Sequence, residues 1–279
     1  MEIKAQTTAQ RFLLHADSLF QRAAYNDAAI AFERAIYAAE TDMELYHYAL
    51  LQKAYTYKAT GNFTKAFNTL QRTDAATMPD SLRGVVKYET VLNAYLAGMF
   101  KEAEFELLQL EHQYPNDTAQ INELLFLKIL VQNELQQWDN AKQSFEKYLA
   151  LHHLPPSVAE DYYAFIKNPR LRNPEKARTL STFMPGVGQI YGGNIGQGLI
   201  SLGLQLGLLG FGAYNIWQGY YITGFASGLA LFQAFYFGGI ENAEAATIRK
   251  NKEKIARYNG RVRFFVLEVE GGEWWQHKA

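Results

Sequence analysis

A long stretch without a single charged or histidine residue constrains this chain more than any other feature. Residues 179–240 contain no Asp, Glu, Lys, Arg or His, whereas the residues before them mix both signs of charge every few positions. A helix needs ~20 predominantly apolar residues to cross a bilayer, and two such helices fit here, at 195–217 and 222–240. A buried hairpin of a soluble domain is the alternative, but one soluble core rarely covers so long a segment on all sides. The sequence therefore predicts two transmembrane helices joined by a turn at 218–221.

Glycines recur at helical spacing inside both predicted spans. Gly203 and Gly207 lie in the first span, and Gly224 and Gly228 lie in the second. Helix backbones without side chains approach closely and gain packing contacts that lipid does not match. We expect these glycines to pack the two spans against each other. Assembly of several copies through the same glycines stays open, so a homo-oligomer is an alternative partner.

Two glutamines occupy the middle of the predicted spans, Gln205 in the first and Gln233 in the second. An amide in hydrocarbon needs a hydrogen-bond partner. We therefore expect the two side chains to contact each other across the hairpin.

The composition argues against several classes of function. The formal net charge of the 279 residues is −1, so no broad basic field attracts phosphate backbones, and nucleic acid is not expected as a partner. Cysteine is absent, which removes disulfides and thiolate chemistry. His152 and His153 are adjacent in a predicted turn, and no cluster of titratable residues forms a catalytic pattern. We expect no enzyme activity, no metal site and no cofactor.

The chain before the apolar stretch carries an internal repeat. Ala28, Ala66, Ala103 and Ala141 recur about every 38 residues, a period typical of helix-pair solenoids. An aromatic residue stands three positions before each alanine, and a large apolar residue stands four positions after it. These residues are Tyr25, Phe63, Phe100 and Trp138 before, and Phe32, Leu70, Leu107 and Phe145 after. A small alanine lets the two helices of a pair approach, so the pattern predicts four helix pairs.

The repeats resemble tetratricopeptide repeats. Ala28-x-x-x-Phe32 and Ala141-x-x-x-Phe145 match that family's pattern, whereas the Trp and Leu-Gly of its first helix are missing. The resemblance implies that the first helix of each pair lines a concave groove for a peptide or another protein. Aligned on their alanines, the units place an aromatic groove at Tyr48, Tyr55, Lys58, Tyr88, Tyr95 and Phe126. The alternative is that these rings only pack neighbouring first helices together.

Helix boundaries within the repeats follow from turn and cap residues. Gly61 and Gly98 stand at turns inside the second and third pairs. Helix starts are expected at 41–44, 117–120 and 157–160, where a short polar side chain is followed three residues later by an acid or amide. A capping helix from Ser157 to about Lys167 should close the last repeat.

A glycine-rich motif precedes the first predicted span. Its residues are Pro185, Gly186, Gly188, Gln189 and Tyr191. The motif should break the chain and lay Tyr191 at the membrane interface. A phosphate-binding loop is not expected, because no Lys-Ser/Thr follows and no strand pattern precedes the glycines. The segment resembles a bacterial family of two-helix membrane hairpins of unknown function, which implies an envelope protein of a Gram-negative bacterium.

Together these features predict an all-α chain in three parts. Residues 1–168 form a tetratricopeptide-like solenoid of four repeats plus a capping helix. Residues 169–258 form the transmembrane hairpin with its flanking basic helix. Residues 259–279 form a short helical or β tail, because 261–270 are rich in strand-forming residues.

The membrane orientation has two readings. Basic residues flank the hairpin on both sides, which places both termini in the cytoplasm. In contrast, residues 1–6 resemble the end of a secretory signal with Ala5 at the cleavage position. We favour periplasmic repeats.

The expected function is a membrane-anchored scaffold or adaptor of the bacterial cell envelope, with a role in protein biogenesis or secretion. Its expected partners are another protein or peptide and the lipid bilayer. The alternative is a small oligomeric channel or transporter component built from the glycine-rich hairpin.

Overall fold

The computed structural model describes residues 7–39, 41–113, 122 and 124–274, and these residues form helices and connecting turns without a strand. The predicted all-α class is therefore confirmed over this part of the chain. The chain divides into two compact units, Met1–Tyr163 and Ala164–Ala279. The proposed signal remnant at 1–6 and the proposed helix start at 117–120 lie outside the described residues.

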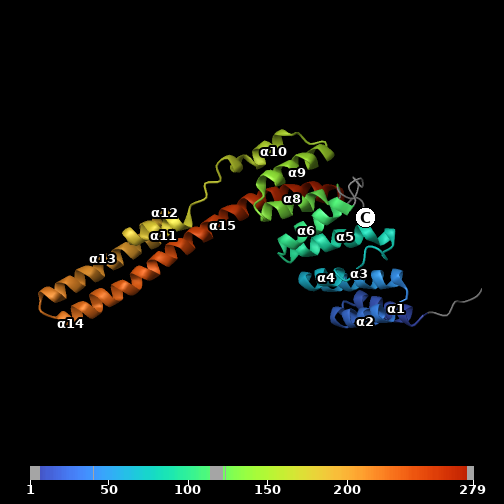
Figure 1. The fold of residues 1–279 in the computed structure, drawn as a ribbon, viewed down its shortest axis with the longest axis horizontal. Coiled ribbons are helices and arrows are strands. Elements are labelled where there is room, and N and C mark those ends of the chain that lie inside the picture. Colours follow the sequence, from blue (N-terminus) through green and yellow to red (C-terminus); the bar gives the residue numbers. More distant parts are fainter. Residues whose placement is uncertain (1–6, 40, 114–121, 123, 275–279) are drawn as a thin grey trace, which may run out of the picture. The chain divides into compact units, whose positions relative to one another are not determined.

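The first unit consists of short helices that pack in chain order (Figure 1). They are α1 (Thr8–Gln21), α2 (Tyr25–Ala38), α3 (Met43–Ala59), α4 (Phe63–Leu70), α5 (Asp80–Leu96), α6 (Phe100–Gln113), α8 (Leu125–Glu134), α9 (Trp138–Leu151) and α10 (Ser157–Tyr162). Each helix contacts the one before it, so the core is a series of small apolar clusters between neighbouring helices.

The repeat pattern coincides with the second helix of each pair. The four aromatic residues that precede the alanines are the first residues of α2, α4, α6 and α9. All four alanines are fully buried, and so are the large residues one turn later, with at most 4 % of their surface exposed. A small side chain at the crossing point and a large one a turn away explain why the sequence repeats at these positions.

The same backbone turn precedes each of these second helices. Two residues before the aromatic, the chain adopts a left-handed conformation with φ between +57° and +74°. The residues in this position are Ala23, Gly61, Gly98 and Gln136. The N–H of the next residue donates to the carbonyl five residues earlier, as from Asn62 to Tyr57 at 2.8 Å. This is the Schellman end of a helix, which favours glycine at the left-handed position.

Helix starts differ in part from the expectation. α3 begins at Met43 and is capped by Asp42, whose Oδ1 accepts from the Leu45 N–H at 3.1 Å. The cap is therefore not Thr41. α10 begins at Ser157 without a side-chain cap, because Pro156 precedes it.

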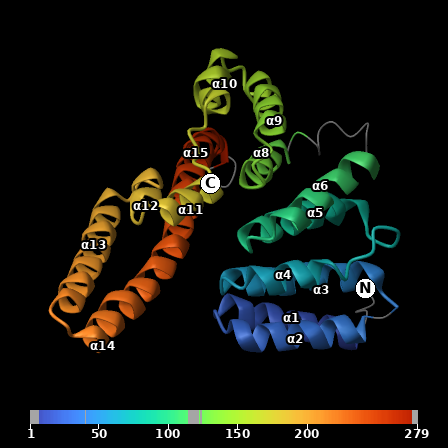
Figure 2. The same ribbon diagram turned by 60° about the vertical axis from the view of Figure 1, so that its left-hand side comes forward.

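The second unit begins with a 3-10 turn and continues as a helical hairpin (Figure 2). Its elements are the 3-10 turn Ala164–Lys167, α11 (Pro174–Phe183), α12 (Val187–Tyr191), α13 (Ile195–Trp217), α14 (Tyr221–Thr223), a π-helix (Gly224–Ala230) and α15 (Leu231–Trp274). α13 packs along the π-helix and α15, and α11 and α12 pack against α15 as well.

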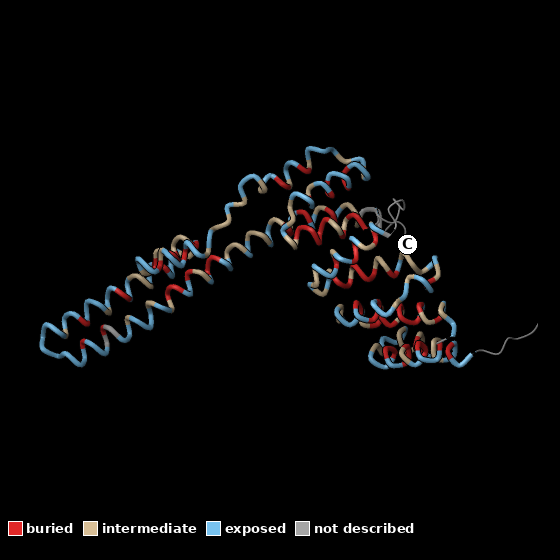
Figure 3. The backbone as a smooth tube through the Cα atoms, viewed as in Figure 1, coloured by how far each residue is buried: buried red, intermediate tan, exposed pale blue. Residues whose placement is uncertain are grey.

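One helix of the described residues, α13, is long and apolar enough to span a membrane. Most of its length is exposed, as the pale blue end of the hairpin shows (Figure 3), with Ile200 71 % and Leu206 61 % exposed. The second predicted span, 222–240, is not one regular α-helix. It passes through α14, the π-helix and the start of α15. Among the described residues only α13 meets the length and hydropathy of a membrane-spanning helix. The π-helix contains Gly224 and Gly228, where the two arms of the hairpin approach each other closely.

Of the two alternatives for the C-terminal tail, helix or strand, the helical one is confirmed for the residues described. Residues 259–274 continue α15 without a break. Extending an existing helix adds one hydrogen bond for each residue fixed, and so local strand propensity is overridden. In the helix Val262 and Val266 lie one turn apart, and both are fully buried.

The left-handed turns yield a stability prediction. Gly61→Ala should destabilise the protein by ~1–2 kcal/mol, because an L-residue pays that cost in the left-handed region. A Cβ at Gly61 would meet no atom within 4 Å, so sterics add nothing. Gln136→Gly removes an existing L-residue from the same position and should stabilise by up to ~1 kcal/mol. Urea unfolding of the full-length protein, followed by circular dichroism, measures both effects.

Gly260→Ala is the matched control. Gly260 lies inside α15, and an added Cβ there also meets open space. Alanine is favoured over glycine in a helix, so this variant should be neutral or more stable. Equal destabilisation by Gly61→Ala and Gly260→Ala would contradict the role of the turn.

Candidate functional site

The residues of the predicted groove lie on the first helices of three pairs. Tyr48, Tyr55 and Lys58 belong to α3, Tyr88 and Tyr95 to α5, and Phe126 to α8.

The structure brings several of these rings together. Burial, followed by the nearby charge of Glu89, raises the pKa of Tyr55 to about 12, and Tyr48 and Tyr88 act in the same direction. The rings of Tyr88 and Phe126 have centroids 6.2 Å apart. A row of aromatic side chains therefore crosses from α3 over α5 to α8.

The members of this row differ in exposure. Tyr55, Tyr88 and Phe126 are half-buried and pack against the apolar clusters. Tyr95 packs against the same core and lies 5.6 Å from the Phe100 ring at the start of the next helix. Tyr48, at 36 % exposure, offers more surface to a partner than the other rings do.

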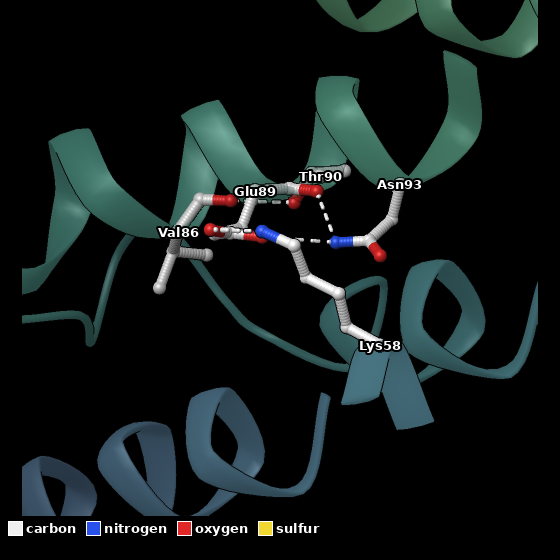
Figure 4. A network of polar contacts seen from close by, with 5 residues as sticks. All are labelled: Lys58, Val86, Glu89, Thr90 and Asn93. Atoms are coloured by element: carbon white, nitrogen blue, oxygen red, sulfur yellow. Dashed lines mark hydrogen bonds and ion pairs between the residues drawn. The ribbon is translucent and has the colours of Figure 1, made fainter. Parts of the chain in front are cut away.

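Lys58 is engaged in a polar network that sequence reasoning missed (Figure 4). Its Nζ donates to both carboxylate oxygens of Glu89 at 2.8 Å, and the Asn93 amide donates to Glu89 Oε2 at 3.1 Å. The Glu89 side chain is only 8 % exposed. Lys58 therefore neutralises a buried carboxylate of the neighbouring pair. The signal in the sequence was weak: a glutamate among the apolar residues of a helix.

A cavity of about 300 Å³ opens beside Tyr48, where the first turns of α1, α3 and α5 meet. Leu13, Leu45 and Leu82 contribute apolar walls, and Asp42 and Glu44 contribute carboxylates. The cavity joins three first helices, and the repeat alignment did not predict it.

The Lys58–Glu89 pair gives a prediction. Lys58→Met should destabilise the protein by ~1–3 kcal/mol, because it leaves the Glu89 carboxylate buried with Asn93 as its remaining side-chain donor among the described residues. The lower figure allows for solvent at Lys58, whose side chain is 31 % exposed. In the double variant Lys58→Met/Glu89→Leu the charge is gone, and most of the stability should return. Urea unfolding measures both; a double variant no more stable than the single one would contradict the pairing.

In the second unit the glycines of the predicted membrane motif permit close helix approach. Gly186 has φ +85° and starts α12 between α11 and α13. A Cβ at Gly186 would collide with the carbonyl oxygen of Gly198, and one at Gly188 would collide with that of Ala177. Pro185 precedes this turn, where no helical hydrogen bond is lost. The motif thus folds α11, α12 and the start of α13 onto one another.

The last two residues of the motif have polar roles. The Tyr191 ring lies 5.5 Å from Lys176 Nζ and 6.0 Å from the Arg172 guanidinium carbon, and its hydroxyl accepts from the Asn173 N–H at 3.3 Å. Gln189 is 4 % exposed, and its amide donates to the carbonyl of Gly239 on α15 at 3.3 Å.

The glycine contact of the hairpin involves partly different residues from those expected. A Cβ at Gly203 or Gly207 would meet nothing within 4 Å, so these two glycines face away from the second arm. Gly212 makes the close approach instead, since its Cβ would lie 2.7 Å from the Gly228 Cα and 3.1 Å from the Gly224 carbonyl oxygen. The spacing of glycines predicts that they share one face of a helix, but it does not predict whether that face contacts the other arm.

The expected contact between two glutamines is also absent. Gln205 is 2 % exposed, and its amide donates to Ser201 Oγ at 3.1 Å, whereas Gln233 is exposed. Gln205 lies beside Gly239, whose added Cβ would be 3.4 Å from Gln205 Nε2. The buried glutamine thus faces a glycine rather than the other glutamine.

Comparison of the chain with protein families, with curated proteins and with solved structures gives no match.

Proposed function

We propose that this protein is a non-enzymatic, membrane-anchored scaffold of the bacterial cell envelope that binds another protein or peptide through its helix pairs. One observation carries the proposal: a single chain joins a charge-free, largely exposed helix to a compact unit of repeated helix pairs. Apolar surface of this extent on a helix requires lipid or a partner to cover it. Helix-pair units that stack in chain order provide extended surfaces for recognition.

The second arm of the hairpin supports a two-span anchor. From Tyr221 to Ile240 it has no charge, and it packs along α13 through Gly212. Its outward side chains are exposed, among them Ile222, at 87 %, and Phe225, at 64 %. Two antiparallel helical arms satisfy their own backbone hydrogen bonds, as a hydrocarbon environment demands.

The proposed anchor predicts how the protein fractionates with membranes. The wild-type protein should stay with the membrane pellet after alkaline carbonate washing and require detergent for release. Leu206→Arg in α13 or Leu231→Arg in the second arm should reduce stable insertion, since a central charge costs ~2.5–3.5 kcal/mol. Ile248→Arg, on the basic part of α15 beyond the proposed spans, is the control and should leave fractionation unchanged. Release of the wild-type protein by carbonate would refute the anchor.

A second experiment tests the orientation of the protein in the membrane. Reporters inserted after Ala76 and fused after Ala279 should lie on one side of the membrane, because two spans return the chain to the side of origin. We expect the periplasmic side. Opposite sides would refute the second span, and a cytoplasmic signal from both would show that the basic flanks set the orientation.

The groove proposal centres on Tyr48, which is exposed and lines the cavity of the first helices. Tyrosine combines apolar area with a hydroxyl at small entropic cost, which suits recognition. In-cell crosslinking from a photoreactive residue at position 44, followed by mass spectrometry, should identify the partner.

Tyr48→Ala should then weaken binding of that purified partner while the melting temperature changes little. Tyr95→Ala is the matched packing variant and should destabilise the fold by ~1–3 kcal/mol, because that ring is part of the core. Undiminished affinity in a folded Tyr48→Ala variant would rule out this groove.

A further inference from the structure

A second cavity lies within the hairpin unit, between the start of α13 and α15. Its volume is about 350 Å³. Along α15 its wall runs from Ala234 to Arg249, about 22 Å at 1.5 Å per residue. The opposite wall comes from Gln189 of α12 and from residues 197–204 at the start of α13.

The polarity of this cavity changes from one end to the other. Ile200, Leu204 and Phe235 line the end that lies within the proposed spans. Asn242 and Arg249 line the end beyond them. The cavity lining thus changes from apolar to cationic. A bilayer changes in the same direction, from its hydrocarbon core to its headgroup layer.

Arg249 brings a charge to the polar end of the cavity without a direct ion pair among the described residues, although its field, together with that of Lys250, acts on the Glu253 carboxylate. No carboxylate lies within ion-pair distance of its guanidinium among the described residues, and Glu253, one turn further on, pairs with Lys250 at 3.0 Å. The other nearby acid, Glu244, pairs with Arg178 at 3.4 Å. A guanidinium at the polar end of a cavity matches the geometry of a phosphate group.

The floor of the cavity is polar at a depth where lipid tails would be expected. Gln189 lines it, and Gly239 brings Gln189, Ser201 and Gln205 together, each within 4.0 Å of an added Cβ. The amide of Gln189 is oriented by its donation to Gly239, and its Oε1 has no donor among the described residues. Buried polar groups in a membrane segment are costly, so an amide oxygen left without a donor is a candidate contact for a bound molecule.

We infer that this cavity binds one glycerophospholipid molecule, with its phosphodiester at Arg249 and Asn242 and its acyl chain along Ile200, Leu204 and Phe235. The length of the cavity matches one leaflet, which is half of the ~30 Å core plus a headgroup layer of ~5–7 Å. The inference rests on the proposed membrane anchor, because a lipid reaches this cavity only from a bilayer. A free phosphate would use Arg249 but would leave the apolar end uncovered.

The test measures phospholipid retention by native mass spectrometry of the full-length protein. The protein is purified in detergent and incubated with phosphatidylglycerol in mixed micelles. Arg249→Gln should lower retention at least about tenfold, the effect of losing one charge-assisted hydrogen bond. Lys252→Gln is the matched control, because Lys252 is exposed on the same helix and does not line the cavity.

A second pair of variants tests the cavity itself. Gly238 lines it, and a side chain there has room to enter, so Gly238→Leu should block lipid retention. Gly207→Leu adds the same bulk to an equally open position outside the cavity and should retain lipid. Diacylglycerol with the same acyl chains should not be retained, and inorganic phosphate should not displace the phospholipid.

The outcomes separate this inference from the membrane anchor. If carbonate releases the wild-type protein, the anchor fails and the lipid site fails with it. If the protein stays in the membrane but retains no phosphatidylglycerol, only the lipid site is wrong. Equal losses from Arg249→Gln and Lys252→Gln would indicate diffuse charge attraction and overturn the site. Retention of diacylglycerol, displacement by phosphate, or an unaffected folded Gly238→Leu variant would overturn it as well.

Discussion

One backbone turn, the left-handed end of a helix, reverses the chain inside each helix pair of the first unit and recurs at both ends of α13. It ends the first helix of each of the four pairs, at Ala23, Gly61, Gly98 and Gln136, and it recurs at Gly193 and Gly219 before and after α13. In each case an N–H donates to the carbonyl five residues back, for example from Tyr220 to Asn215 at 2.9 Å. Because this bond fixes the exit angle of the chain, the next helix returns against the previous one. The buried alanines and the glycine contact at Gly212 then determine how closely the paired helices pack.

The sequence predicted those parts of the fold that depend on side-chain size at repeated positions. The aromatic residue three places before each repeat alanine proved to be the first residue of the second helix. Two of the turns were visible as glycines. The other two were not, since Ala23 and Gln136 adopt the same conformation without a residue type that reveals it. Boundaries were less certain where two polar residues compete for the cap, as Thr41 and Asp42 do.

The functional residues were harder to predict because they depend on rotation and on long-range pairing. Glycine spacing in α13 predicted that Gly203 and Gly207 contact the second arm. The contact is made by Gly212 instead, which lies on a different face of the helix. Lys58 was placed in the groove by the repeat alignment, and the structure pairs it with Glu89, thirty-one positions later. Neither the rotation of a helix nor such a pair is encoded in a local pattern. The tail at 261–270 was left open between helix and strand for a related reason, since its composition favours strand while its continuity with α15 favours helix.

The continuity of α15 has a mechanical consequence. Forty-four residues without a break make a rod about 66 Å long, and its first ten residues, 231–240, belong to the proposed anchor. A rod has no hinge at which a movement of the anchor can be absorbed. If the bilayer thins or thickens, the anchor adapts by changing its tilt, and the far end at Trp274 must swing through a proportionate arc. The helix would thus act as a lever that converts the thickness of the surrounding lipid into the position of its distant end.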